Sequence, residues 1–162
     1  MNGKDILYVA ITGLSNPVDN RIIAVDLNSD DGADANEGSG QELHSRSRAF
    51  VYDYVRPGLN VSASAFSMPD NLALDHDGNL FIAEDPGGSF ATKRNGDDVW
   101  LAAPPHARRA PAVSVGRFFS LTDCDAEPTG LYVDLKRDVL FVNVQHRGGD
   151  RLDKAVAIQR SR

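Results

Sequence analysis

The sequence predicts an all-β protein, a partial β-propeller arc of about two and a half to three four-stranded blades. Three observations lead to this fold class. Short segments rich in β-branched and aromatic residues alternate with Gly, Pro, Asn and Asp. No segment keeps apolar residues at helical spacing over several turns. One hairpin pattern recurs at intervals of roughly 60 to 70 residues, and about four strands fit into each interval, as in a propeller blade.

Strands are expected wherever such a short apolar segment lies between two turn-forming clusters. In chain order they are residues 5–12, 21–27, 49–55, 71–75, 79–84, 98–103, 116–121, 130–134, 139–145 and 155–159. Each segment is too short for an amphipathic helix but has the usual length of a β-strand. The expected secondary structure is therefore a series of hairpins and meanders.

Three of these segments repeat one another. Residues 5–10 align with residues 78–83 and with residues 138–143, and the last two copies follow similar strands at 69–75 and 128–134. If the strands of a blade are called A to D from the centre outward, the chain reads B-C-D, then A-B-C-D, then A-B-C. Such an arc is open at both ends. A β-sandwich of similar strands is the alternative that strand patterning leaves open.

Length, composition and charge limit the function classes. With 162 residues, of which 41% are hydrophobic, residues 1–162 are expected to form a single domain. The net charge of -6 and the absence of a basic stripe argue against nucleic acid as a partner. No apolar run approaches the roughly 20 residues of a membrane span, and no export signal is recognised at the start. A metal ion or a small molecule is the expected partner.

Polar side chains collect at one end of the second and third hairpins. A turn at residues 75–78 would bring Asp70 and Asn71 beside Glu84 and Asp85, because the strands of a hairpin run antiparallel. In the third hairpin, Glu127 and Thr129 at the start of one strand would likewise approach Gln145 and His146 at the end of the next. These ends share one face of a propeller next to its channel. The candidate metal ligands are Asp70, Asn71, Glu84, Asp85, Glu127 and His146.

Carboxylate, amide and imidazole groups suit a hard cation, with Ca²⁺ favoured and Mg²⁺, Mn²⁺ or iron as alternatives. The plainer interpretation is that Asp and Asn before a strand form turns and need no ligand. Asp75 and Asp77 lie in the tight turn at the opposite end of the hairpin, and we assign them to that turn.

A second acidic segment, residues 26–37, has much of the spacing of an EF-hand calcium loop. Asp31 stands where that loop needs Gly, and strands rather than helices are expected on either side. We therefore predict a solvated acidic loop between strands, on the face opposite Asp70 and Glu84.

Residues 69–86, PDNLALDHDGNLFIAEDP, and residues 127–149, EPTGLYVDLKRDVLFVNVQHRGG, carry a family resemblance. Over roughly residues 67–160 the chain resembles the C-terminal part of the PhoX-type alkaline phosphatase family. The resemblance implies a propeller that hydrolyses phosphate esters with calcium and iron and is exported to the periplasm or beyond. Because that family's chains are several times longer, it also implies a C-terminal fragment, with the missing blades or self-association through open edges as partners.

The resemblance supports the six candidate metal ligands as residues near the metal centre. Lys93, Arg94 and Arg147 fall on the same face and are candidates for gripping the phosphate, although solvated surface charges are the plainer interpretation. Cys124 is the only cysteine, which excludes an internal disulfide, and we expect it to be an incidental loop residue rather than an iron ligand.

Two other function classes stay open. A calcium-dependent propeller lactonase or esterase of the gluconolactonase or paraoxonase type would use Asn71 and acidic residues from different blades equally well, but such enzymes lack the segment Val144-Gln145-His146. The third class is a non-catalytic binding module whose polar strand ends are structural.

Overall fold

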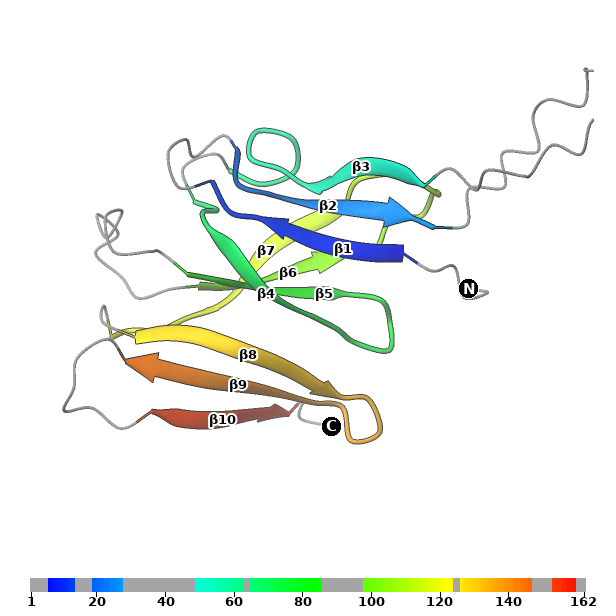
Figure 1. The fold of residues 1–162 in the computed structure, drawn as a ribbon. Helices are drawn as coiled ribbons and strands as arrows, with labels where there is room; N and C mark the ends of the chain where they lie inside the picture. The colour runs from blue at the N-terminus through cyan, green and yellow to red at the C-terminus, as the bar shows by residue number, and fades with distance from the viewer. Residues whose placement is uncertain are drawn as a thin grey trace, which may run out of the picture.

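The computed structural model describes residues 6–13, 19–27, 49–62, 65–85, 98–123, 126–146 and 153–159 (Figure 1). These residues form ten β-strands in three antiparallel sheets, with no α-helix among them. Within this part of the chain there is accordingly no helix long and apolar enough to cross a membrane. The predicted all-β class is confirmed.

Each sheet is a meander of consecutive strands. The first sheet contains β1 (Ile6–Ile11), β2 (Arg21–Asp26) and β3 (Phe50–Val55). The middle sheet contains β4 (Pro69–Leu74), β5 (Leu80–Glu84), β6 (Asp98–Ala103) and β7 (Ser114–Ser120). The last sheet contains β8 (Ala126–Asp134), β9 (Val139–His146) and β10 (Lys154–Gln159). The strands thus divide into groups of three, four and three, in the order that the repeat predicts.

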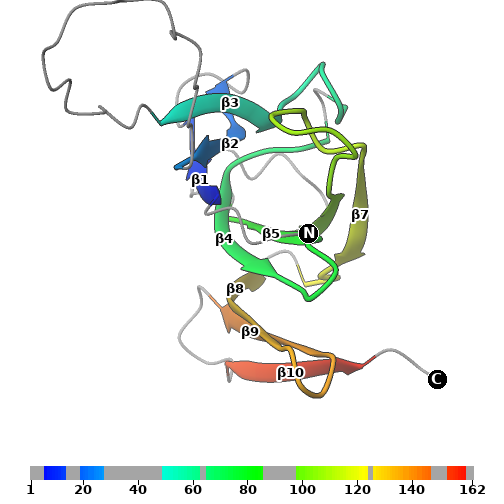
Figure 2. The same ribbon diagram turned by 90° about the vertical axis from the view of Figure 1, so that its right-hand side faces the viewer.

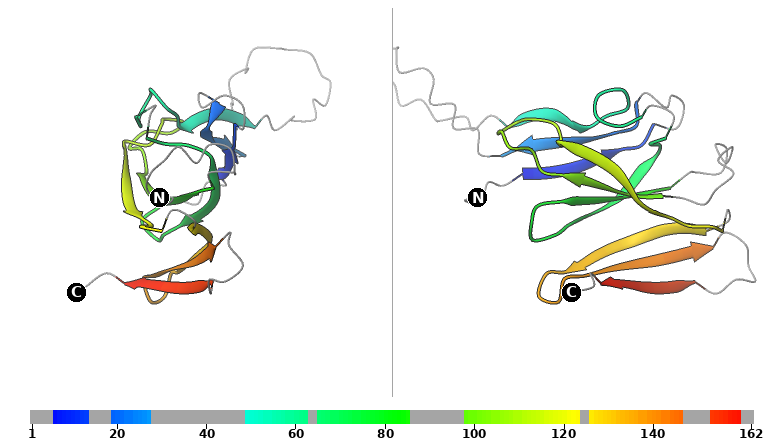
Figure 3. Two further views of the ribbon diagram at one scale, coloured as in Figure 1. Left: turned by 90° about the vertical axis from the view of Figure 1, so that its left-hand side faces the viewer. Right: turned by 180° about the vertical axis from the view of Figure 1, so that it is seen from behind.

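The middle sheet lies between the other two. Figures 1 and 2 show this order from two sides, with β4 between β1 and β8, and β4 contacts both of these strands. The view from behind in Figure 3 shows the first and last sheets at opposite ends of the stack. Both faces of the middle sheet are therefore covered.

Side chains alternate between the two faces of each sheet, because successive residues of a strand point to opposite sides. The repeated segments put a leucine on one face and the next residue, an aromatic one, on the other. We call the two sides the leucine face, with Leu7, Leu80 or Leu140, and the aromatic face, with Tyr8, Phe81 or Phe141. Residues paired across the strands continue each face, as Leu80 with Ala102 and Phe81 with Leu101.

Two hydrophobic cores follow from this alternation. In the first core, Tyr8 and Ala24 from the aromatic face of the first sheet meet Ile82 and Trp100 from the leucine face of the middle sheet. In the second core, the aromatic face of the middle sheet meets the leucine face of the last sheet. Its members are Phe81, Ala83, Val99, Leu140 and Val142, with Leu131, Val133 and Ile158 packed against them.

The turns of the two later hairpins are built alike. The Oδ1 atom of Asp75 accepts hydrogen bonds from the backbone N–H groups of Asp77 and Asn79, at 2.9 and 2.8 Å. Asp134 does the same for the N–H groups of Lys136 and Arg137. The hydrogen bond from the Arg137 side chain lowers the pKa of Asp134. These aspartates close turns, as predicted for Asp75.

Asp26, the first residue of the acidic segment, is buried rather than solvated. It ends β2 on the face that packs into the first core, and its Oδ2 atom lies 2.8 Å from Arg108 Nε and 3.3 Å from Arg109 Nε. Asp26 pairs with Ile6 at one end of β1, whereas Thr12, whose hydroxyl donates to Pro69 O, follows the other end. Asp26 therefore lies at the end of the first sheet away from Pro69. Arg108 and Arg109 together neutralise the Asp26 carboxylate. Residues 28–37 of the acidic segment lie outside the described residues.

Ile82 tests the packing between the first and middle sheets, because its side chain is fully buried in the first core. Ile82→Ala should lower the free energy of unfolding by about 2–5 kcal/mol, through lost apolar burial and the cavity it leaves. Urea unfolding followed by circular dichroism measures this change. The control is Leu135→Ala in the β8–β9 turn, where the side chain is 58% exposed and the effect should stay within about 0.5 kcal/mol. Equal effects of the two substitutions would contradict the packing.

Candidate metal centre

The register of the β4–β5 hairpin brings its polar ends together. Leu74 pairs with Leu80, Leu72 with Ile82, and Pro69 with Glu84. These pairs agree with the turn predicted at residues 75–78 and with the antiparallel hairpin expected from it. Pro69 lies opposite Glu84. Asp70 follows Pro69 and Asp85 follows Glu84, so both aspartates belong to the same end of the hairpin.

A β-bulge shapes this end of the hairpin. Two residues of β4, Asp70 and Asn71, lie between Pro69 and Leu72, whereas one residue of β5, Ala83, lies between their partners, so β4 carries one extra residue. The β8–β9 hairpin carries a bulge at the matching place, between Thr129 and Tyr132. Such a bulge bends the strand and changes the direction of its side chains.

The two bulges contact each other. Asn71 in β4 and Gly130 in β8 occupy matching positions of the repeat, and the Gly130 N–H donates to Asn71 Oδ1 at 3.1 Å. The other end of the Asn71 amide donates from Nδ2 to Asp70 Oδ2 at 2.5 Å. Asn71 thereby links the middle and last sheets and orients Asp70.

Three carboxylates converge where these sheets meet. Oxygen atoms of Asp70, Asp85 and Glu127 all lie within 4.8 Å of one another. Asp70 is exposed, Asp85 is half-buried and Glu127 is only 8% exposed. The group therefore combines residues from β4, from the end of β5 and from β8, and it is reachable from solvent through Asp70.

The arrangement suits a hard divalent cation. Like charges this close repel one another, and a cation between them reverses the sign of the interaction. Two oxygens that bind one Ca²⁺ at 2.3–2.6 Å are at most about 5 Å apart, which agrees with the observed spacing. Ca²⁺ takes about 6–8 oxygen ligands, so three carboxylates leave coordination positions for other oxygens.

Glu84, another predicted ligand, is outside this three-carboxylate group. Its side chain is 1% exposed, and its Oε1 atom accepts the Ser67 N–H at 2.7 Å. Met68, which follows Ser67, has a positive φ of 45°, and the Met68 carbonyl accepts the Asp85 N–H at 2.9 Å. Glu84 therefore supports the bend that leads into β4, and through that bend it helps to position Asp85.

The remaining predicted site residues have less structural description. His146 ends β9, where its backbone pairs with Ala126 next to Glu127, but its side chain is not among the described ones. Lys93, Arg94 and Arg147 lie outside the described residues, as does Cys124. Their predicted roles stay predictions.

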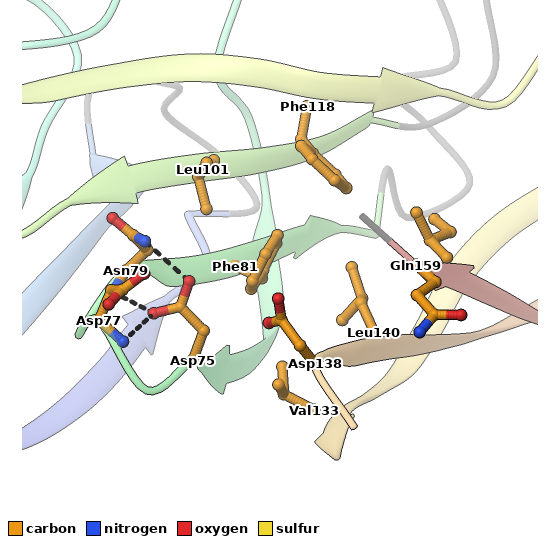
Figure 4. A pocket seen from close by; sticks show the side chains of 11 residues that line it. Asp75, Asp77, Asn79, Phe81, Leu101, Phe118, Val133, Asp138, Leu140 and Gln159 are labelled. Carbon is orange, nitrogen blue, oxygen red and sulfur yellow. Dashed lines mark hydrogen bonds between the residues drawn. The ribbon is translucent and has the colours of Figure 1, made fainter. Parts of the chain in front are cut away.

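A cavity of about 280 Å³ lies at the opposite end of the hairpins (Figure 4). Phe81 and Leu101 of the middle sheet and Leu140 of the last sheet line it, together with Asp75 and Asp138 from the turns. Figure 4 shows Asp75 bound to its own turn, with its oxygens directed to Asp77 and Asn79. The cavity is therefore separate from the three carboxylates, and Asp75 serves the turn as predicted.

Sequence reasoning missed two residues that organise the site. One is Ser67, whose N–H holds Glu84, and the other is Gly130, whose N–H holds Asn71. A signal for Gly130 was present, because Pro69-Asp70-Asn71-Leu72 aligns with Pro128-Thr129-Gly130-Leu131. A glycine at that matching position indicates a bulge with a positive φ. Ser67 has no comparable signal.

Comparison with known proteins identifies a family. The sequence model of the alkaline phosphatase PhoX family matches residues 54–148, which is more than half of the chain and includes Asp70, Asp85 and Glu127. No curated protein and no solved structure gives a significant match.

Gly130 tests the contact between the two bulges. It has a φ of +53°, and a Cβ atom added there would lie 2.5 Å from Asn143 Nδ2, so Gly130→Ala should lower the free energy of unfolding by about 1–3 kcal/mol. Chemical denaturation measures this loss. Gly116→Ala on β7 is the control, because nothing lies within 4 Å of its added Cβ. Combining Gly130→Ala with Asn143→Ala should restore part of the loss; no difference between the Gly130 and Gly116 variants would refute the strained bulge.

Proposed function

Because the chain belongs to the PhoX family of alkaline phosphatases, we propose that it takes part in the metal-assisted hydrolysis of phosphate esters. The observation that carries this proposal is the group of three carboxylates within 4.8 Å of one another, all inside the matched region. Small phosphate monoesters are the proposed substrates, and Ca²⁺ is the proposed resident cation. Iron is a further proposed cofactor, on the resemblance alone.

In this proposal Asp70, Asp85 and Glu127 hold the cation. When bound, a divalent cation supplies positive charge that attracts ester oxygens and offsets the charge developing on phosphorus. The three carboxylates leave part of the coordination shell open, and the exposed position of Asp70 gives a phosphate ester access from solvent. Both features support substrate binding directly beside the cation.

Other residues fix the carboxylates in place. Asn71 donates to Asp70 and is itself held by the Gly130 N–H, which limits the rotation of the Asp70 side chain. Glu84 anchors the Ser67 N–H next to the bend at Met68, and the Met68 carbonyl holds the Asp85 backbone. Such supporting hydrogen bonds orient the ligands of a metal site and tune its affinity. We propose His146 as an additional ligand on the family resemblance alone, since the backbone of Glu127 pairs with Gln145 and that of His146 with Ala126.

We also propose that the three sheets are consecutive blades of a propeller. The support is that β4 contacts both β1 and β8, and that the aromatic face of each sheet packs on the leucine face of the following one. In a propeller, the starts of the innermost strands and the ends of their neighbours surround the central channel. The three carboxylates come from such positions, which supports a site at the channel.

An exported location is part of the same proposal. The calcium sites of extracellular modules are weak, with dissociation constants of about 10⁻⁴–10⁻³ M, and we propose that this partly exposed site is of that kind. Such a site fills only where calcium is abundant, as it is outside the cytoplasm. The family resemblance points to the same compartment.

Calcium binding should depend on the three carboxylates. Asp70→Asn, Asp85→Asn and Glu127→Gln should each raise the calcium dissociation constant about tenfold or more, because each removes a charged ligand. Isothermal titration calorimetry measures the constants. Asp77→Asn is the matched control, since Asp77 is an exposed aspartate in the turn at the other end of the hairpin, and it should leave the affinity unchanged. A control variant as defective as the others would place calcium elsewhere.

Turnover by the 162-residue chain should be low. Efficient phosphoryl transfer needs several positioned charges, and the described residues contain one such group of three carboxylates. With 4-nitrophenyl phosphate we expect slow hydrolysis that needs added calcium and disappears in the Asp85→Asn variant. Fast turnover by a verified monomer would refute the low-turnover prediction. Calcium-dependent hydrolysis of a lactone without phosphatase activity would instead support the lactonase class.

A further inference from the structure

In the part of the chain that the structure describes, two sheet faces at opposite ends of the stack are open, and both are apolar. On the leucine face of the first sheet, Leu7 is 52% exposed and Val51 is 55% exposed. On the aromatic face of the last sheet, Tyr132 is 63% exposed and Phe141 is 37% exposed. Apolar side chains grouped in this way on a surface are characteristic of a binding interface.

Strand pairing shows that each group forms one continuous face. Leu7 pairs with Val25, and Val25 pairs with Val51, so these three side chains cross the first sheet in a row. In the last sheet, Phe141 pairs with both Tyr132 and Ala157. The rings of Tyr132 and Phe141 lie 6.2 Å apart at 32°. Each open face is therefore a row of apolar side chains that spans its sheet.

The two covered interfaces of the molecule follow a single rule. The aromatic face of the first sheet, with Tyr8, packs on the leucine face of the middle sheet, with Leu80 and Ile82. The aromatic face of the middle sheet, with Phe81, packs on the leucine face of the last sheet, with Leu140. The open face of the last sheet is of the aromatic type and that of the first sheet is of the leucine type. By this rule the two open faces are complementary to each other.

We propose that these two faces bind each other between two copies of this chain. The aromatic face of the last sheet of one copy packs on the leucine face of the first sheet of the other copy. The contact continues the same packing rule that already operates twice within the chain, so the second copy needs no new recognition chemistry. The interface follows from this packing rule, and its closure into a ring rests in addition on the proposed propeller arrangement of the three sheets.

The interface is head-to-tail, because it joins two different surfaces. Such a contact forms a closed ring when the rotation between copies closes, and an open filament when it does not. Two copies of three sheets give six sheets, which lies within the range of about 4–8 blades of closed propellers. The proposed assembly is therefore a ring of two copies with two equivalent interfaces.

Analytical ultracentrifugation of the purified chain, from nanomolar to high micromolar concentration, tests the assembly. We expect a reversible change from the 17.5 kDa monomer to a species of twice that mass. Leu7→Lys and Tyr132→Lys should each abolish the dimer, and so should the backup variants Val51→Lys and Ala157→Lys. Leu135→Lys and Leu59→Lys are matched controls, because these leucines are similarly exposed but lie in turns, and they should dimerise normally.

A mixing experiment tests the head-to-tail geometry. The Leu7→Lys variant keeps an intact aromatic face and the Tyr132→Lys variant keeps an intact leucine face, so their mixture should form a heterodimer through one interface, weaker than the wild-type dimer. Circular dichroism spectra like that of the wild type establish that the variants are folded. The proposal is overturned by a wild-type chain that stays monomeric, by mass that grows without limit, by dimers that the face variants leave intact, or by folded variants that fail to combine.

Discussion

The structure depends on the strand register of the β4–β5 hairpin and on the single extra residue in β4. A shift by one residue would move every side chain of a strand to the other face of its sheet. In the observed register, Leu80 and Ile82 pack toward the first sheet, while Phe81 packs toward the last sheet. The same register fixes Pro69 opposite Glu84, which brings Asp70 and Asp85 to one end. Core packing and the acidic group are thus two results of one pairing.

This pairing separates the two ends of the hairpin by function. The turn end is satisfied internally, since Asp75 and Asp134 accept backbone N–H groups of their own turns. At the other end, the carboxylates of Asp70, Asp85 and Glu127 face one another across two sheets. Carboxylates that close turns are common and need no ligand, whereas three carboxylates that converge from different strands are suited to sharing one cation. The difference between the ends is why the proposed chemistry belongs to one of them.

The sequence predicted the strands and the hairpin register because both depend on local patterns, namely alternating side chains and turn residues. It did not predict that Asp85 belongs to the three-carboxylate group while Glu84 accepts the Ser67 N–H. This difference depends on the bulge in β4 and on the bend at Met68, neither of which is visible in the turn sequence. The burial of Asp26 was also missed. Its partners Arg108 and Arg109 are more than 80 residues away, and nothing in the spacing of the chain links them. Long-range polar pairs leave no periodic signal.

Anomalous diffraction from crystals of the chain grown with a lanthanide, which replaces Ca²⁺ at oxygen-rich sites, tests the central claim most directly. The strongest anomalous peak should lie between the carboxylates of Asp70, Asp85 and Glu127, within about 2.3–2.6 Å of their oxygens. A strongest peak at the turn end, beside Asp75 or Asp138, would contradict the claim, and so would a crystal in which these three carboxylates bind no ion at all.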